Sequence, residues 1–306
     1  MNIRFDHFIT YTNAASIDYY LKEYAAQGFA PDDKTVRHDP GLRNGFIWLG
    51  PEYIEFCWVE DEKAFAEAGA EEEILRKQPR PFAIGMIARD VQAVHNDWAA
   101  RGYKLPEVES KAARDSAADA PPRWSFQDIP DELLPGASCF ALTYHSRPKD
   151  EVKQLKIPPN TIYAVSGVSF VTPEAQLRAE RWRDLLAPEA KVRQSEFGFS
   201  VQVPPHQAEW LTPEAYQAAY QRRWIPSQPP YGDLALLHLL ATDLRTVKKM
   251  LEASGRQTIS IRHSEEEQIL IEPDPRDGFA FLVQERPAGP WLQERIVQTG
   301  ERLVIV

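Results

Sequence analysis

The chain opens with a short apolar stretch that carries a single histidine, Arg4-Phe5-Asp6-His7-Phe8-Ile9-Thr10. A second stretch of the same kind, Leu236-Leu237-His238-Leu239-Leu240-Ala241-Thr242, lies near the other end of the chain. Each is short enough for one strand and stands just before a segment with helical spacing of its apolar residues. The two stretches therefore predict equivalent strands, each with one imidazole on it.

Four such strands are expected along the chain, each followed by an amphipathic helix and by further strand-like segments. The strands span residues 5–12, 82–88, 163–171 and 235–241, and the helices span residues 17–27, 91–101, 175–186 and 245–254. Gly28, Gly102 and Gly255 follow three of the helices, where glycine commonly ends a helix. This pattern predicts an α+β protein built from four repeats of one strand-helix-strands module.

The repeats are expected to form two domains. Prolines between residues 146 and 159 interrupt both regular patterns and favour a linker, so we place the boundary near residue 155. Residues 1–155 then hold modules one and two, and residues 156–306 hold modules three and four.

Alignment of the four opening strands puts two histidines and two glycines at one equivalent position. These residues are His7, Gly85, Gly167 and His238. Because the histidines belong to the outer modules, a pairing of modules one and four around a shared site is kept open.

The composition argues against several classes of function. The formal net charge of −10 disfavours nucleic acid and anionic membrane surfaces as partners. No apolar stretch reaches the roughly 18 to 20 residues that cross a bilayer, and the N-terminus lacks the pattern of a secretory signal, so we expect a cytoplasmic protein. Cys57 and Cys139 are too few for a disulfide framework and are expected to be buried thiols.

One carboxylate stands out in a strand-like run, Tyr53-Ile54-Glu55-Phe56. By strand alternation Tyr53 and Glu55 share a face, and a buried carboxylate is costly without a metal, an arginine or a proton as partner. Two imidazoles and one carboxylate can bind a divalent metal and leave positions open for substrate. The sequence therefore predicts a metal site formed by His7, Glu55 and His238, with a structural ion pair of Glu55 as the alternative.

Further polar residues lie where a pocket mouth is expected. The turn-rich segment 37–44 precedes a strand, and its guanidinium, amide and imidazole groups can bind an anion or move a proton, although a solvated loop is the alternative. The expected substrate-binding residues are Arg43, Asn44, Tyr53 and Tyr144, and the expected acid-base residues are Glu55, His38 and His145. The remaining histidines, His95, His206 and His263, are expected at the surface.

These features resemble the glyoxalase-like domain family of the vicinal oxygen chelate superfamily. The resemblance rests on Phe5-Asp6-His7-Phe8, on Arg37-His38-Asp39-Pro40-Gly41-Leu42-Arg43-Asn44 and on Leu49-Gly50-Pro51-Glu52-Tyr53-Ile54-Glu55-Phe56, and it continues through Phe140-Ala141-Leu142-Thr143-Tyr144-His145. It implies βαβββ modules that form two half-open mixed β-barrels. It further implies a metal inside a barrel, bound by histidines of first strands and glutamates of last strands, with substrate oxygens chelating it.

The resemblance also narrows the expected reaction. It favours a metal-dependent lyase or isomerase that stabilises an enediolate-type anion of a small oxygen-rich substrate. An extradiol-type dioxygenase and a metal-free small-molecule-binding protein remain alternatives, because the fold does not select the reaction. Leu282 stands where a second glutamate often lies, with Glu285 as a reserve ligand, so the metal can be Zn, Ni, Mn or Fe. The expected partner is a small molecule, and a homodimer is kept open.

Overall fold

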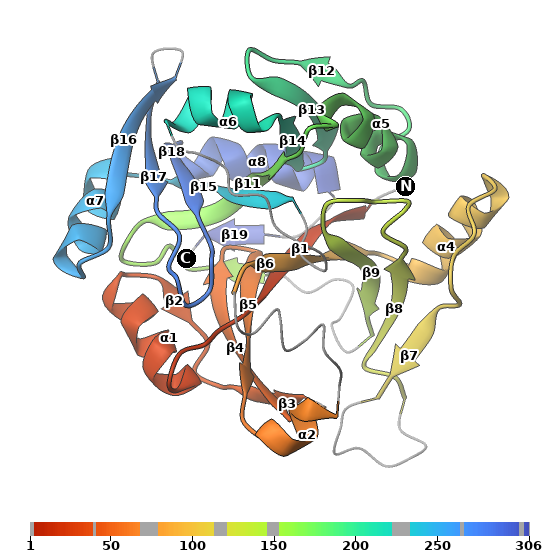
Figure 1. The fold of residues 1–306 in the computed structure, drawn as a ribbon, viewed down its shortest axis with the longest axis horizontal. Coiled ribbons are helices and arrows are strands. Elements are labelled where there is room, and N and C mark those ends of the chain that lie inside the picture. Colours follow the sequence, from red (N-terminus) through yellow and green to blue (C-terminus); the bar gives the residue numbers. More distant parts are fainter. Residues whose placement is uncertain are drawn as a thin grey trace.

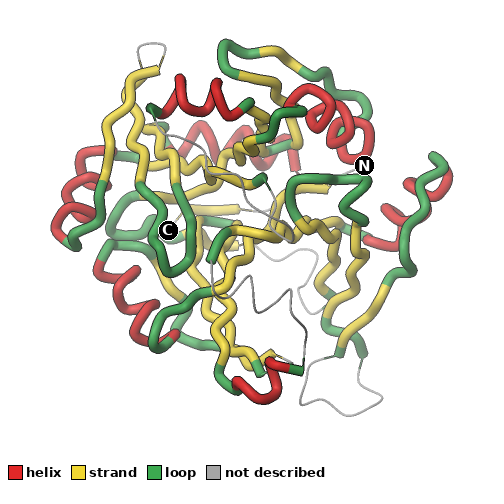
Figure 2. Tube along the Cα trace, in the orientation of Figure 1, coloured by secondary structure: helices red, strands yellow, loops and turns green. Residues whose placement is uncertain are grey.

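The computed structural model describes residues 3–38, 41–67, 79–112, 121–145, 153–221, 233–263, 266–299 and 303–305. These residues form two large mixed sheets with helices around them and one small two-stranded sheet (Figure 1). Strands and helices are interspersed along the whole described chain (Figure 2). No helix among these residues is long and apolar enough to span a membrane.

Modules one and two supply the first sheet. Module one consists of β1 (Ile3–Tyr11), α1 (Ile17–Ala26), β2 (Ala30–Pro31), β3 (Val36–His38), β4 (Leu42–Leu49) and β5 (Glu52–Val59), followed by the short helix α2 (Glu62–Ala66). Module two consists of β6 (Pro81–Ala88), α4 (Val91–Ala100), β7 (Glu109–Lys111), β8 (Trp124–Ile129) and β9 (Ser138–Tyr144).

Modules three and four supply the second sheet. Module three consists of β11 (Ile162–Val171), α5 (Ala175–Leu186), β12 (Arg193–Gln194), β13 (Gly198–Val203) and β14 (His206–Leu211), followed by α6 (Pro213–Tyr220). Module four consists of β15 (Leu234–Ala241), α7 (Leu244–Ala253), β16 (Thr258–His263), β17 (Glu266–Ile271) and β18 (Phe281–Glu285). The chain continues into α8 (Ala288–Thr299) and β19 (Leu303–Ile305), and β19 pairs in parallel with β10 (Lys153–Leu155).

Each sheet is built by the same pairing rule. Opening strands of consecutive modules pair antiparallel at the centre, β1 with β6 and β11 with β15. Each opening strand also pairs in parallel with the last strand of its own module, as β1 does with β5 and β11 does with β14. The resulting orders are β2-β4-β5-β1-β6-β9-β8-β7 and β12-β13-β14-β11-β15-β18-β17-β16. The chain is therefore four βαβββ modules arranged in two mixed sheets.

The pairing of modules one and four that was kept open does not occur in the sheets. β1 lies in the first sheet and β15 in the second, because neighbours in sequence usually become neighbours in space. Modules one and four contact each other outside the sheet pairing: for example, Tyr20 and Tyr24 of α1 both donate to Oδ2 of Asp277, Tyr24 at 2.6 Å. Burial raises the pKa of the Asp277 carboxyl.

The strand register places each repeat histidine opposite a repeat glycine. His7 lies opposite Gly85, and His238 lies opposite Gly167. A Cβ atom on Gly85 would overlap the ring of His7, so the glycine makes room for the imidazole. This register agrees with the alignment of the four opening strands made from the sequence.

A buried ionic cluster joins the two halves and corrects one expectation. His206 was expected at the surface but is fully buried at the start of β14, with Nε2 at 3.0 Å from Oε1 of Glu52. Arg295 of α8 donates to the same oxygen at 2.5 Å. Burial alone raises the pKa of Glu52, but Arg295 and His206 together hold it below its ordinary value.

Helix ends and buried thiols follow the sequence closely. Gly28, Gly102 and Gly255 follow α1, α4 and α7 with φ angles of 82°, 89° and 79°, which is the left-handed conformation that glycine adopts at helix ends. Cys57 and Cys139 are buried and unpaired, as expected. Burial raises the pKa of each thiol, so both stay protonated.

Candidate metal and substrate sites

Several of the predicted site residues meet on the first sheet. Nε2 of His7 lies 3.8 Å from Oε2 of Glu55, and the ring of His7 stacks on Tyr53 with ring centroids 4.7 Å apart. Asn44 of β4 donates to Oε1 of Glu55. Tyr144 reaches the group from β9, with its hydroxyl 3.0 Å from that of Tyr53. We call His7, Asn44, Tyr53, Glu55 and Tyr144 the first-sheet cluster.

A bulge in β1 adds Asp6, which sequence reasoning did not select. Phe5 lies opposite Met86 and His7 lies opposite the adjacent residue Gly85, so Asp6 is the extra residue of a bulge in β1. On a regular strand Asp6 and His7 would point to opposite faces. The bulge instead brings Oδ2 of Asp6 within 2.9 Å of Nδ1 of His7, and the same oxygen accepts from Tyr144 at 3.0 Å.

This arrangement creates a place for a cation. Because Oδ2 of Asp6 can only accept, Nδ1 of His7 donates to it, and Nε2 is left facing the carboxylate of Glu55. Two acceptors that face each other repel unless a second proton or a metal ion lies between them. Burial raises the pKa of Tyr53, with Asp6 and Tyr144 adding to the effect, so this phenol is a neutral donor.

A third donor atom belongs to the same cluster. Asn44 is 3% exposed, and within the described part of the chain its Oδ1 has no hydrogen-bond partner. A buried amide oxygen without a partner is costly and points to a ligand. An imidazole nitrogen, a carboxylate oxygen and an amide oxygen are donors that Mn, Fe, Ni or Zn accept, so the residues fit a divalent metal.

The structure does not gather the three predicted ligands in one place. His238 lies on β15 in the other sheet, and its ring bonds to Ser169 at 2.6 Å. Accordingly, the described residues contain no group of three His, Cys, Asp or Glu side chains that could hold a metal. The predicted set His7, Glu55 and His238 is thus split between two sheets, because opening strands pair with their sequence neighbours.

The other predicted acid-base and substrate residues lie outside the cluster. His38 ends β3 and is partly buried, and His145 is exposed, with Nε2 at 2.8 Å from Oγ of Ser125. Arg43 pairs with Glu60, which also binds Arg37. The hydrogen bond from Arg37 lowers the pKa of Glu60, and Arg43 adds to that effect.

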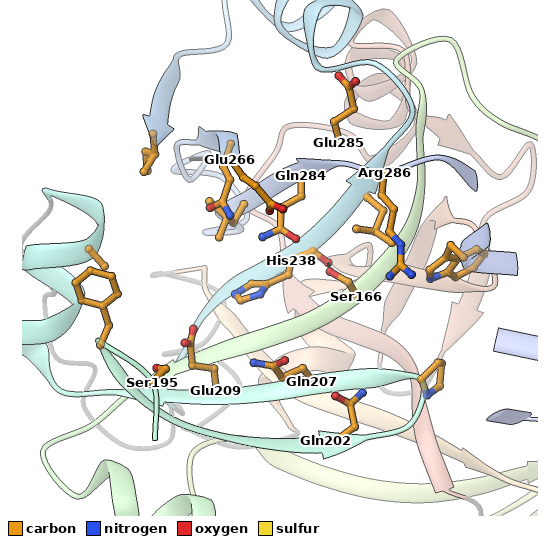
Figure 3. A pocket seen from close by; sticks show the side chains of 18 of the residues that line it. Ser166, Ser195, Gln202, Gln207, Glu209, His238, Glu266, Gln284, Glu285 and Arg286 are labelled. Carbon is orange, nitrogen blue, oxygen red and sulfur yellow. Dashed lines mark hydrogen bonds between the residues drawn. The ribbon is translucent and has the colours of Figure 1, made fainter. Parts of the chain in front are cut away.

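The second sheet holds a cavity of about 780 Å³ with His238 in its wall (Figure 3). Ser169 donates to Oε2 of Glu209 at 2.9 Å and lies 2.6 Å from Nε2 of His238. Sequence reasoning missed Glu209, although it is the repeat equivalent of Glu55. Glu55 pairs with the residue two positions after His7, and Glu209 pairs with the residue two positions after Gly167.

The reserve ligand Glu285 has another role. Its carboxylate accepts from the backbone amide of Leu244 at 3.0 Å, at the start of α7. Figure 3 shows this carboxylate pointing away from His238. Leu282 lies directly opposite His238 in β18, so no carboxylate faces the imidazole from that position.

Comparison with known proteins places the chain in a family. A model of the glyoxalase-like domain matches residues 5–186, and the chain belongs to this family. No curated protein matches the chain in sequence.

Solved structures show the same fold at low identity. The Mn(II)-bound glyoxalase from Novosphingobium aromaticivorans is 12% identical, with a TM-score of 0.55 over 99% of this chain and 87% of that one. A mutant of 4-hydroxymandelate synthase from Streptomyces coelicolor is 12% identical, with a TM-score of 0.53 over 99% of each chain. A catechol 2,3-dioxygenase is 11% identical, with a TM-score of 0.53 over 92% of this chain and 88% of that one. The fold is that of the vicinal oxygen chelate superfamily.

Proposed function

We propose that the protein is a metal-dependent enzyme of the glyoxalase-like class, with its metal on the first sheet between His7 and Glu55. The observation that carries the proposal is the 3.8 Å approach of Nε2 of His7 to Oε2 of Glu55 while Asp6 occupies Nδ1. A carboxylate behind a metal-binding imidazole fixes its ring and raises its basicity. Asn44 supplies the third donor through its buried Oδ1. Membership of the family supports the same assignment.

The side chains around this site have separate tasks. When bound, the metal supplies Lewis-acid polarisation of neighbouring substrate oxygens. Asp6 holds the ring of His7, and the hydroxyls of Tyr144 and Tyr53 form a chain that holds Asp6. Because the pKa of Tyr53 is raised, its hydroxyl keeps its proton within this chain.

The proposed reaction is proton transfer on a small oxygen-rich substrate. Glu55 is the carboxylate at which a proton removed from a carbon beside a carbonyl is held and returned. Removal and return of one proton gives isomerisation, and loss of a leaving group after removal gives elimination. An isomerase or lyase therefore requires only groups that the first-sheet cluster contains.

The metal site is tested by reloading metal-free protein separately with Mn, Fe, Ni and Zn and measuring bound metal by elemental analysis. We expect about one metal per wild-type chain and a loss of that metal in His7→Gln and Glu55→Gln. His238→Gln is the matched control, because this histidine lies in the other sheet, and it should keep the metal. Equal metal in wild type and Glu55→Gln would overturn the site.

The reaction is tested with the loaded protein on vicinal diols, α-keto compounds and catechols, with dissolved oxygen recorded. Turnover without oxygen uptake supports an isomerase or lyase. Oxygen uptake that is stoichiometric with product would replace that reaction with a dioxygenase reaction. Absence of turnover with a fully loaded site would contradict an enzyme acting on these three substrate classes.

A further inference from the structure

The cavity of the second sheet is not used by the proposed metal site. Its volume of about 780 Å³ is in the range of small-molecule sites. The strand β14 forms part of its wall, because Gln207 and Glu209 line the cavity. The alternate residues Ala208 and Trp210 are fully buried in the core. One face of β14 therefore borders the cavity.

Ser169, Glu209 and His238 form a hydrogen-bonded group, and its hydrogen bonds determine which of their atoms are left for a ligand. The hydroxyl of Ser169 has one proton and donates it to Oε2 of Glu209 at 2.9 Å. It can therefore only accept from Nε2 of His238, at 2.6 Å. This places the imidazole proton on Nε2 and makes Nδ1 an acceptor. Burial lowers the pKa of His238, against an opposing effect of Glu209, so the ring stays neutral near neutral pH.

Two acceptor atoms are left for a ligand. Among the described residues, neither Nδ1 of His238 nor Oε1 of Glu209 takes part in a hydrogen bond, and both side chains line the cavity. Acceptors bind groups that carry a proton. An uncharged ligand that fills this end of the cavity must therefore donate hydrogen bonds.

The charges in the wall disfavour an anion. Both arginines in the described lining are already paired, Arg286 with Glu294 at 2.6 Å and Arg295 with Glu52 at 2.5 Å. Glu209 adds a carboxylate that has no arginine partner in the described wall. A carboxylate or phosphate on the ligand would face this charge without a free guanidinium to bind it.

Amide side chains cover much of the remaining polar wall. Gln207, Gln268 and Gln284 come from three strands, β14, β17 and β18, and all line the cavity. Each amide offers donors and an acceptor, and a hydroxyl group also donates and accepts. Such a wall matches a ligand with several hydroxyl groups better than an apolar one.

We propose that this cavity binds a polyhydroxylated small molecule of the sugar or polyol type that carries no anionic group. Two of its hydroxyls donate to Nδ1 of His238 and Oε1 of Glu209, and the glutamine amides bind further hydroxyls. The site is separate from the metal site of the first sheet and does not depend on it.

The proposal is tested by calorimetry and ligand-observed NMR on the full chain with glucose, sorbitol and myo-inositol as neutral probes. Gluconate is the anionic probe of similar size. We expect at least one neutral probe to bind with a Kd of about 1 mM or tighter, and at least about tenfold more tightly than gluconate. Glu209→Gln and Gln207→Leu should each weaken this binding about tenfold or more.

Gln92→Leu is the matched control, because it makes the same amide-to-alkyl change on the exposed face of α4. Since Gln207 is exposed at the cavity wall, Gln207→Leu should fold normally, and circular dichroism checks this. Three results would overturn the proposal: no binding of any neutral probe, tighter binding of gluconate, or equal binding in Gln207→Leu, Glu209→Gln and Gln92→Leu.

Discussion

Replacement of Glu52 by glutamine should destabilise the protein far more than loss of an ordinary ion pair. The Glu52 carboxylate is fully buried and accepts from Arg295 and His206, and Arg295 is itself 2% exposed. In Glu52→Gln the guanidinium stays buried and loses the counter-charge of Glu52. Breaking a buried pair in this way costs about 3 to 5 kcal/mol.

This loss is large enough to measure by urea unfolding. With a slope of about 3 kcal/mol per M urea, a loss of 3 kcal/mol lowers the midpoint by about 1 M. Glu252→Gln is the matched control, because its pair with Lys248 is about half exposed and is expected to be worth less than about 1 kcal/mol.

A double variant separates the cost of an unpaired buried charge from the cost of altered packing. Glu52→Gln with Arg295→Met removes both charges and should recover part of the lost free energy of unfolding, because no buried charge is left unpaired. A loss below about 1 kcal/mol in Glu52→Gln, or no recovery in the double variant, would refute the argument that this pair joins the halves.

Three further predictions follow from the site geometry. Gly85→Ala should displace the ring of His7 and lower the free energy of unfolding by about 1 to 3 kcal/mol. Gly289→Ala in α8 is the control, because the added Cβ would meet open space, and it should stabilise the protein by about 0.5 to 1 kcal/mol. Equal urea midpoints in the two variants would contradict this prediction. Asp6→Asn should weaken metal binding about 10 to 100-fold in competition with a chelator, and unchanged affinity would exclude the positioning role. The pKa of His238 is lowered in the folded protein, so at a pH below the ordinary histidine pKa of 6.5 the unfolded chain binds more protons than the folded one. The free energy of unfolding should therefore fall as the pH falls from 7.5 to 5.5. It should fall less in His238→Gln than in the wild type.

Local sequence patterns were sufficient to predict the helices and opening strands of the four modules. The expected helix 175–186 is α5 with the same bounds, and α1 ends one residue before the expected limit. Helical spacing and terminal glycines are properties of neighbouring residues, so a single sequence carries them. The alignment of opening strands also placed His7 and His238 at positions that face glycines in the register.

Long-range partners could not be read from the same patterns. His206 was expected at the surface but is buried against Glu52. Because Glu52 lies 154 residues away in the chain, no local pattern around His206 indicates this contact. Asp6 was missed because its side chain turns toward His7 only through a bulge, and a bulge depends on the register with β6. Glu209 carried a usable signal, because it occupies the place of Glu55 in its own module, and alignment of the last strands would have found it.

The most direct test of the proposed function is the position of the metal. Crystals soaked in Mn(II) should show one anomalous difference peak between Nε2 of His7 and Oε2 of Glu55, at about 2.0 to 2.3 Å from each atom. The peak should be absent from crystals of Glu55→Gln treated in the same way. A peak beside His238 and Glu209, or none at either place in fully soaked crystals, would contradict a metal site on the first sheet.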